Sequence, residues 1–179
     1  AFQEAAAHIT FVFSVEDNEV PPPPLEREKH DAYIVGYPNG NVGPLDPITR
    51  MEVATIFYRL LQDDAREQVW CTTYLYPDVE AHSWYSNQVA TLTNAGILSG
   101  FPDGTFGPAK HITRAEFATI AALFFHAPEV SDDAFSDISS NWAREYINRA
   151  AALGLVSGYP DGTFRPNTEI TRAEVMEII

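Results

Sequence analysis

Three arginines occupy the same place in a repeated motif, Ile-Thr-Arg-x-Glu, and could bind an anion. They are Arg50, Arg114 and Arg172. In each copy the Thr and the Glu three residues later form a capping box, in which each side chain binds the other's backbone N–H at the start of a helix. A cation beside the positive end of a helix dipole is mildly unfavourable, so three repetitions of this choice suggest a purpose. Free N–H groups together with a guanidinium would bind a carboxylate or a phosphate.

A structural role for the same arginines is the alternative. The chain holds 25 Asp+Glu, so each arginine could instead pair with an acidic residue of the neighbouring repeat. The two roles can coexist.

Two tryptophans and two aspartates recur one repeat apart and form a second set of candidates. Trp84 and Trp142 are expected to begin helices, where an exposed indole would stack on a sugar ring and a buried one would hold the next repeat. Asp78 and Asp137 either cap those helices or accept hydrogen bonds from sugar hydroxyls.

The sequence gives little support to catalysis, a metal or another cofactor. The five histidines lack metal-ligand spacing, and the Asp-Gly turns lack the alternating oxygen ligands of a calcium loop. The single cysteine, Cys71, excludes an intrachain disulfide framework and a cysteine-based zinc site. An active site rarely occurs in triplicate, so we expect no enzyme.

The arginines follow a loop that also recurs three times, at residues 36–44, 100–108 and 158–166, with offsets of 64 and 58 residues. Its Pro-Asp-Gly core strongly favours a turn, because Pro presets φ, Asp binds the following backbone and Gly accepts a positive φ. Phe106 and Phe164 come next and are expected to insert between the helices.

Two helices per repeat must position these groups. The first is expected to end at Gly96 or Gly154, where glycine suits a left-handed cap. The second begins after each motif Thr and carries an apolar stripe, such as Phe117, Ile120 and Phe124. One pair of helices cannot bury its own apolar face, so the three second helices are expected to meet around a pseudo-threefold axis.

The repeats define the expected domain boundaries. Residues 1–19 contain a β-like run and are expected to end an upstream β domain, and the Pro-rich residues 20–27 form a linker. Repeat one covers 28–65 and lacks the first helix, repeat two covers 66–128, and repeat three covers 129–179. The last helix of repeat three is expected to be truncated.

The charge balance argues against some partners. The formal net charge is −14, and Lys29 and Lys110 are the only lysines, so binding to nucleic acid or to an anionic membrane is disfavoured. No apolar run approaches the ~20 residues of a membrane-spanning helix.

Residues 158–166, followed by the Ile-Thr-Arg-Ala-Glu motif at 170–174, resemble the S-layer homology (SLH) domain family, and the resemblance extends over about 28–179. It implies a mainly α fold, a three-pronged spindle around a central three-helix bundle. It also implies anchoring of an exported bacterial surface protein to secondary cell-wall polysaccharide of the peptidoglycan, commonly one that carries ketal-linked pyruvate. The motif arginines, and the loop glycines Gly36, Gly100 and Gly158, would line glycan-binding grooves.

The first repeat departs from the family pattern. It has Asn39 for Asp, Val42 for Phe and Met51 for Ala, and it lacks the tryptophan-bearing half. We therefore expect two competent grooves, with the better motifs in repeats two and three. The alternative function is self-assembly with other copies in a surface layer or filament.

Overall fold

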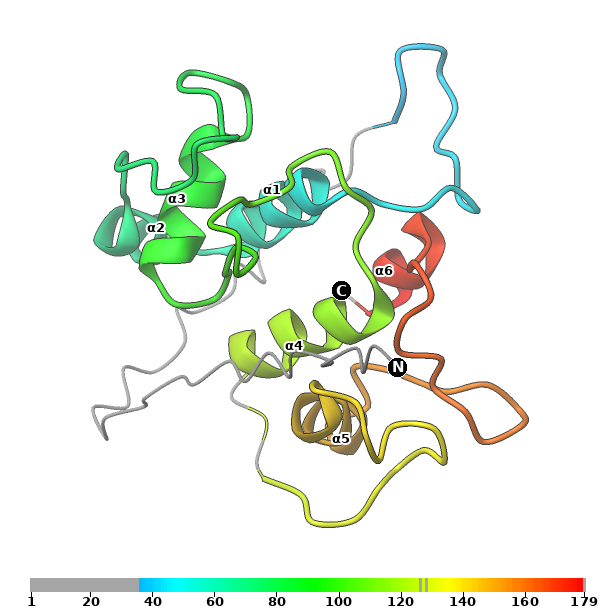
Figure 1. Ribbon diagram of the computed structural model, residues 1–179. Coiled ribbons are helices and arrows are strands. Elements are labelled where there is room, and N and C mark those ends of the chain that lie inside the picture. The colour runs from blue at the N-terminus through cyan, green and yellow to red at the C-terminus, as the bar shows by residue number, and fades with distance from the viewer. Residues whose placement is uncertain (1–35, 126, 128, 179) are drawn as a thin grey trace, which may run out of the picture.

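The computed structural model describes residues 36–125, 127 and 129–178, and this part of the chain forms helices joined by loops, without a β-sheet (Figure 1). The described helices are α1 (Arg50–Leu60), α2 (Asp63–Val69), α3 (Ser86–Asn94), α4 (Arg114–Phe124), α5 (Arg144–Ala152) and α6 (Arg172–Ile178). The predicted mainly α fold is thus confirmed. The expected β-like segment and the Pro-rich linker lie outside the described residues.

The three predicted capping boxes begin α1, α4 and α6. At α4, Glu116 N donates to Thr113 Oγ1 at 3.3 Å, and Thr113 N donates to Glu116 Oε2 at 2.8 Å. The same pair of bonds begins α1 and α6. Local chemistry therefore fixes where each motif helix starts.

The first helices of repeats two and three, α3 and α5, end at glycines as predicted. Gly96 and Gly154 both have φ of +71°, and the next N–H reaches back to the helix, from Ile97 to Leu92 O at 2.9 Å. This 6→1 bond is that of a Schellman motif. The predicted starts were wrong by two residues, because Trp84 and Trp142 lie in turns before Ser86 and Arg144.

Helix α2 was not predicted. It is seven residues long, and its first turn carries Asp63 and Asp64, which suit the positive end of the helix dipole. Arg66 anchors it by donating to Leu61 O at 2.8 Å, and Ala65 is buried.

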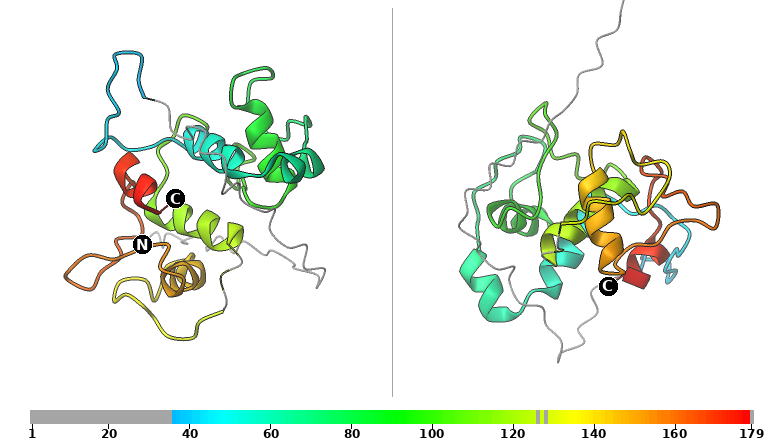
Figure 2. Two further views of the ribbon diagram at one scale, coloured as in Figure 1. Left: turned by 180° about the vertical axis from the view of Figure 1, so that it is seen from behind. Right: turned by 90° about the horizontal axis from the view of Figure 1, so that it is seen from below.

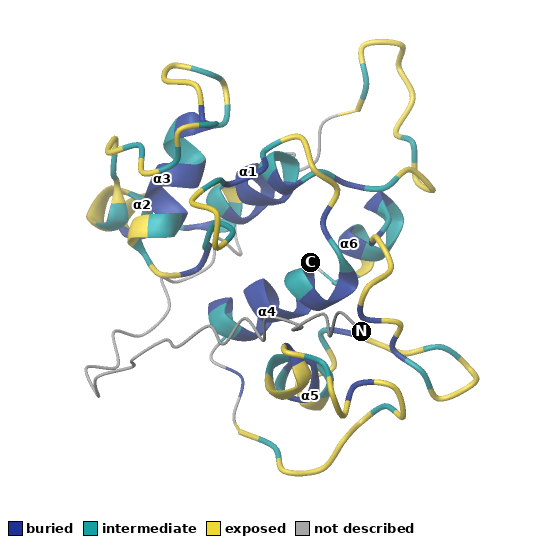
Figure 3. Ribbon diagram, viewed as in Figure 1, coloured by how far each residue is buried: buried dark blue, intermediate teal, exposed yellow. Residues whose placement is uncertain are grey.

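The core consists of two apolar clusters, both of which contain buried residues of α4, and Figure 3 shows the buried stretches of the helices. The larger one joins α1 and α4 through aromatic rings, since the Phe57 centroid lies 5.9 Å from that of Phe117 and 4.9 Å from that of Phe124. Val175 of α6 is buried in the same cluster. The smaller one packs α5 against α4 and contains Phe164. The apolar stripes predicted for α1 and α4 are therefore core.

The three repeats close into a ring through the isoleucine of each motif. Ile48 N donates to Ile170 O at 3.2 Å, Ile170 N to Ile112 O at 3.1 Å, and Ile112 N to Ile48 O at 3.0 Å. All three side chains are buried. The cycle gives the described part of the chain a pseudo-threefold axis, with the motif helices gathered near it and the loops extending outward (Figures 1 and 2).

Candidate functional site

Each motif arginine leaves its own repeat and reaches into the next. Arg114 Nε donates to Phe164 O at 2.8 Å, and its two terminal nitrogens donate to Ser157 O at 2.7 Å and to Glu174 Oε1 at 2.6 Å. Thus one guanidinium of repeat two holds both ends of the loop in repeat three and the motif Glu of that repeat.

The other two arginines repeat this arrangement around the ring. Arg50 donates to the Phe106 and Ser99 carbonyls and to Glu116, and Arg172 donates to the Val42 carbonyl and to Glu52. We call the three sites the junctions one–two, two–three and three–one. Each is named by the repeat that gives the arginine and the repeat that receives it.

The guanidiniums are almost fully buried. Arg50 and Arg114 are 6% exposed and Arg172 is 2% exposed. Burial, partly offset by Glu116, lowers the pKa of Arg50 from its usual value, because the charged form loses hydration. Phe106 and Phe164 lie beneath the planar groups, with ring centroids 4.7 Å from Arg50 Cζ and 4.6 Å from Arg114 Cζ, and both rings are buried as predicted.

The motif glutamates serve two elements at once. Glu116 Oε2 accepts from the capping Thr113 N, while Oε1 accepts from Arg50 of the preceding repeat at 3.2 Å. Because a single carboxylate both starts its helix and receives the arginine, helix formation and repeat packing depend on the same residue.

The prediction of free N–H groups beside each arginine was wrong. At α4 the first two N–H groups donate to Thr168 O and Pro166 O, both at 2.9 Å, and the third donates to Thr113 Oγ1. The backbone of the next repeat runs along the start of the helix and satisfies these donors. The structural role of the arginines is therefore realised, and they do not form an open anion receptor.

The predicted helix-capping role of the two aspartates was also wrong. Asp78 accepts from Phe106 N at 2.8 Å and from Gly107 N at 2.7 Å, and Asp137 accepts from Phe164 N and Arg165 N, both at 2.8 Å. Two successive N–H groups of the loop point to one side and take both carboxylate oxygens. The aspartates therefore fix the loop above the arginine.

The loop glycines allow a close approach of the loop to the segment before the first helix. A Cβ at Gly100 would lie 2.3 Å from the Tyr76 ring and 2.6 Å from Thr105 O, and one at Gly158 would lie 2.4 Å from the Phe135 ring. For Gly36 the nearest described atom is Asn41 O at 3.1 Å. Only glycine fits at Gly100 and Gly158 without a shift.

The two repeated tryptophans lie on the surface. Neither is among the rings that contact the motif arginines. Trp84 is 57% exposed and Trp142 is 46% exposed. Trp84 meets Tyr85 edge-on, with ring centroids 5.4 Å apart. Both indoles are therefore exposed, as stacking on a sugar ring would require, and are not buried against the next repeat. A third exposed indole, Trp70, lies beside Tyr58 and belongs to no repeated motif.

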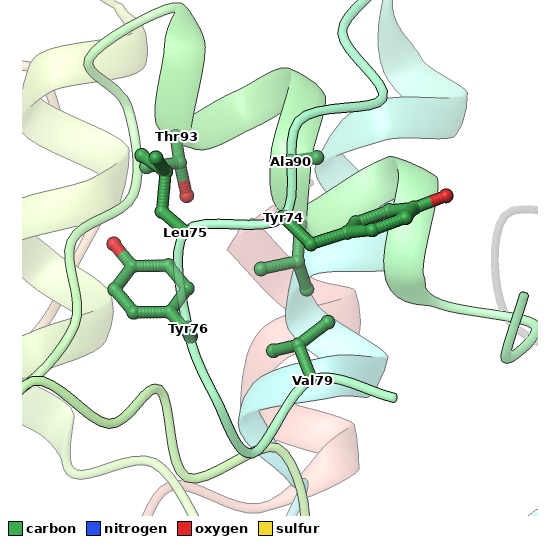
Figure 4. Close-up of a pocket in the computed structure, with 7 residues that line it drawn as sticks. Tyr74, Leu75, Tyr76, Val79, Ala90 and Thr93 are labelled. Atoms are coloured by element: carbon green, nitrogen blue, oxygen red, sulfur yellow. The ribbon is translucent and has the colours of Figure 1, made fainter. Parts of the chain in front are cut away.

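A small apolar depression lies beside α3 and is not part of a junction (Figure 4). Residues of the segment 74–79 face Ala90 and Thr93 there, and the depression is too shallow to enclose a water molecule. The described residues contain no His, Cys, Asp and Glu group that could hold a metal ion. Within the same ranges, every helix is too short or too polar to cross a bilayer.

The fold and the junctions define a class of protein: a helical repeat module that closes on itself through three arginine–glutamate pairs. Comparison with known families identifies the module. A model of the S-layer homology domain matches residues 30–54, 75–118 and 134–176, and the chain belongs to this family.

Relatives among characterised proteins have names that agree with this assignment. The chain is 38% identical over 157 residues to a cellulosome-anchoring protein of Acetivibrio thermocellus and 37% identical over 163 residues to its cell surface glycoprotein 1. It is 35% identical over 147 residues to the surface-layer 125 kDa protein of Lysinibacillus sphaericus. The matches cover 84%, 84% and 79% of this chain but 35%, 7% and 12% of those proteins. The names of the glycoprotein and of the surface-layer protein refer to the cell surface, in agreement with the extracellular, cell-wall location expected for this chain.

Proposed function

We propose that this chain is a non-enzymatic module that binds secondary cell-wall polysaccharide, pyruvylated in its native form, and thereby tethers a larger exported protein to the peptidoglycan. The observation that carries the proposal is the threefold repetition of one built junction within a family that includes an anchoring protein. Several weak sites on one chain gain affinity together on a repetitive polymer.

The candidate residues have different roles in this proposal. Arg50, Arg114 and Arg172 are positioning residues, since each guanidinium is occupied by loop carbonyls and a glutamate. Asp78 and Asp137 hold the same loops from the other side. Together they rigidify the binding surface without contacting the sugar.

Direct contact with the sugar is made by groups that are accessible to solvent. The backbone at Gly36 and Gly158 is exposed and that at Gly100 partly so, and Trp84 and Trp142 offer exposed indole faces to a sugar ring. An exposed indole needs no rearrangement before a sugar stacks on it.

The test is calorimetric titration of the chain with purified cell-wall polysaccharide, native and after removal of pyruvate. The comparison is between Trp84→Ala and the control Trp70→Ala, which removes another exposed indole that belongs to no repeated motif. We expect the Trp84 variant to bind at least tenfold more weakly, about 1.4 kcal/mol, and the Trp70 variant to bind like the wild type. Absence of pyruvate-dependent heat from folded wild type would reject the glycan proposal and favour self-assembly, which sedimentation would detect.

A further inference from the structure

Each junction contains an aromatic ring from the turn of the loop that lies beside the buried arginine. The distances from arginine Cζ to ring centroid are 4.6 Å for Arg50 and Phe101, 5.1 Å for Arg114 and Tyr159, and 4.9 Å for Arg172 and Tyr37. A turn ring beside the arginine is thus common to all three junctions.

The accessible group on that ring differs at each junction. On Phe101 it is Lys110, whose Nζ lies 4.3 Å from the centroid. At the equivalent position of repeat one is Asp46, whose carboxylate lies with the Tyr37 ring beside Gly43, and burial together with this carboxylate raises the pKa of Tyr37. Repeat three has the neutral Thr168 at this position. The three junctions therefore present different charges to solvent.

In repeat three a cation reaches the ring from another position. Arg165 lies with its Cζ 3.9 Å from the Tyr159 centroid, and its backbone adopts φ of +57°, where the other repeats have glycine. It also pairs with Asp161 at 3.0 Å. An incoming anion would have to compete with that carboxylate.

Lys110 has no such competitor at salt-bridge distance. It is exposed, and among the described residues no carboxylate lies within 4.0 Å of its ammonium group. Hydrogen bonds from Thr105, and to a lesser degree the charge of Lys110, lower the pKa of the nearby Asp103. Asp103 Oδ1 already accepts from Thr105 N and Oγ1. Gly107 makes room for the lysine, because a Cβ there would lie 2.8 Å from both Lys110 Cδ and the Phe101 ring.

We propose that Lys110 binds the anionic group of the polysaccharide at junction one–two, and that Asp46, at the equivalent position, excludes anions from junction three–one. Junction two–three, where Arg165 is already paired, binds anions more weakly. This inference rests on the proposed glycan-binding function and names the residue that gives it charge specificity. A charge-assisted hydrogen bond from an ammonium to a carboxylate supplies the contact.

The test uses two synthetic probes, a glycoside of an amino sugar carrying ketal-linked pyruvate and the same glycoside without it. Calorimetry compares the wild type with Lys110→Gln, Lys110→Arg and Arg165→Gln. The control is Arg144→Gln, which removes one exposed cation that pairs with Asp133 and not with a loop ring. We expect at least a tenfold loss of affinity for the pyruvylated probe with Lys110→Gln, recovery with Lys110→Arg, and a smaller loss with Arg165→Gln.

A gain-of-function variant tests the other half of the proposal. Asp46→Lys copies the residue of repeat two onto repeat one, and the Asp46 carbonyl that accepts from Arg172 N is retained. We expect an additional binding site for the pyruvylated probe, and a smaller effect with Asp46→Asn. Circular dichroism confirms that both variants are folded.

The outcomes separate the two proposals. If folded wild type binds both probes equally, or neither, the glycan function with pyruvate fails and the inference fails with it. If wild type prefers the pyruvylated probe while Lys110→Gln matches Arg144→Gln, only the assignment of Lys110 is overturned. If Asp46→Lys gains no site, the exclusion by Asp46 is overturned.

Discussion

At the scale of single residues, the motif arginine explains why a locally unfavourable choice recurs. The guanidinium does not interact with the end of its own helix. In the case of Arg114 it reaches Ser157 O, Phe164 O and Glu174, which lie 43, 50 and 60 residues further along the chain. The small cost of a cation near the helix N-terminus is offset by three hydrogen bonds in a buried place.

Replacing Arg114 with Met should therefore destabilise the fold strongly. The variant keeps the apolar stem but leaves two loop carbonyls and a glutamate oxygen without their donor. We expect the free energy of unfolding in urea to fall by about 3 kcal/mol. Arg144→Met, which breaks the exposed pair with Asp133, should cause a clearly smaller loss. Equal losses in the two variants would contradict a special role for the buried arginine.

A second prediction at this scale concerns the loop glycines. Gly100→Ala should lower the free energy of unfolding by about 2 kcal/mol, because its Cβ would press on Thr105 O, a backbone atom that cannot rotate away. Gly36→Ala is the matched control, with Asn41 O at 3.1 Å as its nearest described atom. Thermal unfolding of both variants measures the difference, and a larger loss at Gly36 would contradict the stated cause.

The residues that sequence reasoning placed correctly are those whose partners lie within a few positions. Thr113 and Glu116 are three apart, and their capping box followed from the motif alone. The partners of Arg114 and Asp137 lie 27 to 60 residues away, so the sequence left their roles open or suggested the wrong one. Exposure of Trp84 likewise depends on packing, which no local pattern encodes.

At the scale of elements, the turn of the loop in repeat three is stabilised by the charged form of Asp161. Hydrogen bonds from the Thr163 side chain, from Arg165 and from Thr163 N lower the pKa of Asp161 to about 2. The unfolded value is near 3.8, so this carboxylate stabilises the fold above about pH 4, and the contribution is lost as the pH falls towards 2.

We expect Asp161→Asn to reduce the pH dependence of stability in that interval. Urea midpoints of wild type and variant, measured from pH 5 down to pH 2, should decline more steeply for the wild type. Direct titration of the Asp161 carboxylate by nuclear magnetic resonance gives an independent reading. An ordinary value near 3.8 would contradict the described hydrogen bonds.

Helix α2 marks the limit of sequence reasoning at this scale. Its residues, Asp63–Val69, are mostly polar and show no apolar stripe, and only Ala65 is buried. The helix is held by Arg66, which donates to Leu61 O and lies over the Tyr58 ring. The acidic first turn was the available signal, and it is weak without a capping side chain.

At the scale of the whole molecule, closure of the ring distinguishes this module from a linear repeat array. In an array each unit contacts only its neighbours and the terminal units are the least supported. Here repeat three also contacts repeat one, through Ile170 with Ile48 and Arg172 with Glu52.

Hydrogen exchange can show whether this last contact supports the first repeat. In Arg172→Met we expect amide protection to fall in residues 44–61 as well as in 166–178, although these segments are more than 100 residues apart. Mass spectrometry of peptides from both segments measures the effect. Loss confined to 166–178 would mean that repeat one is stable without the closing contact.

The isoleucine cycle has a consequence for how such a module could be rebuilt. Because every motif isoleucine donates to one neighbour and accepts from the other, the ring has no first or last member. The order in which the ribosome makes the three units is therefore immaterial to the finished hydrogen-bond pattern. A circularly permuted chain that opens at the tip of another loop and joins the old ends by a linker could form the same three junctions.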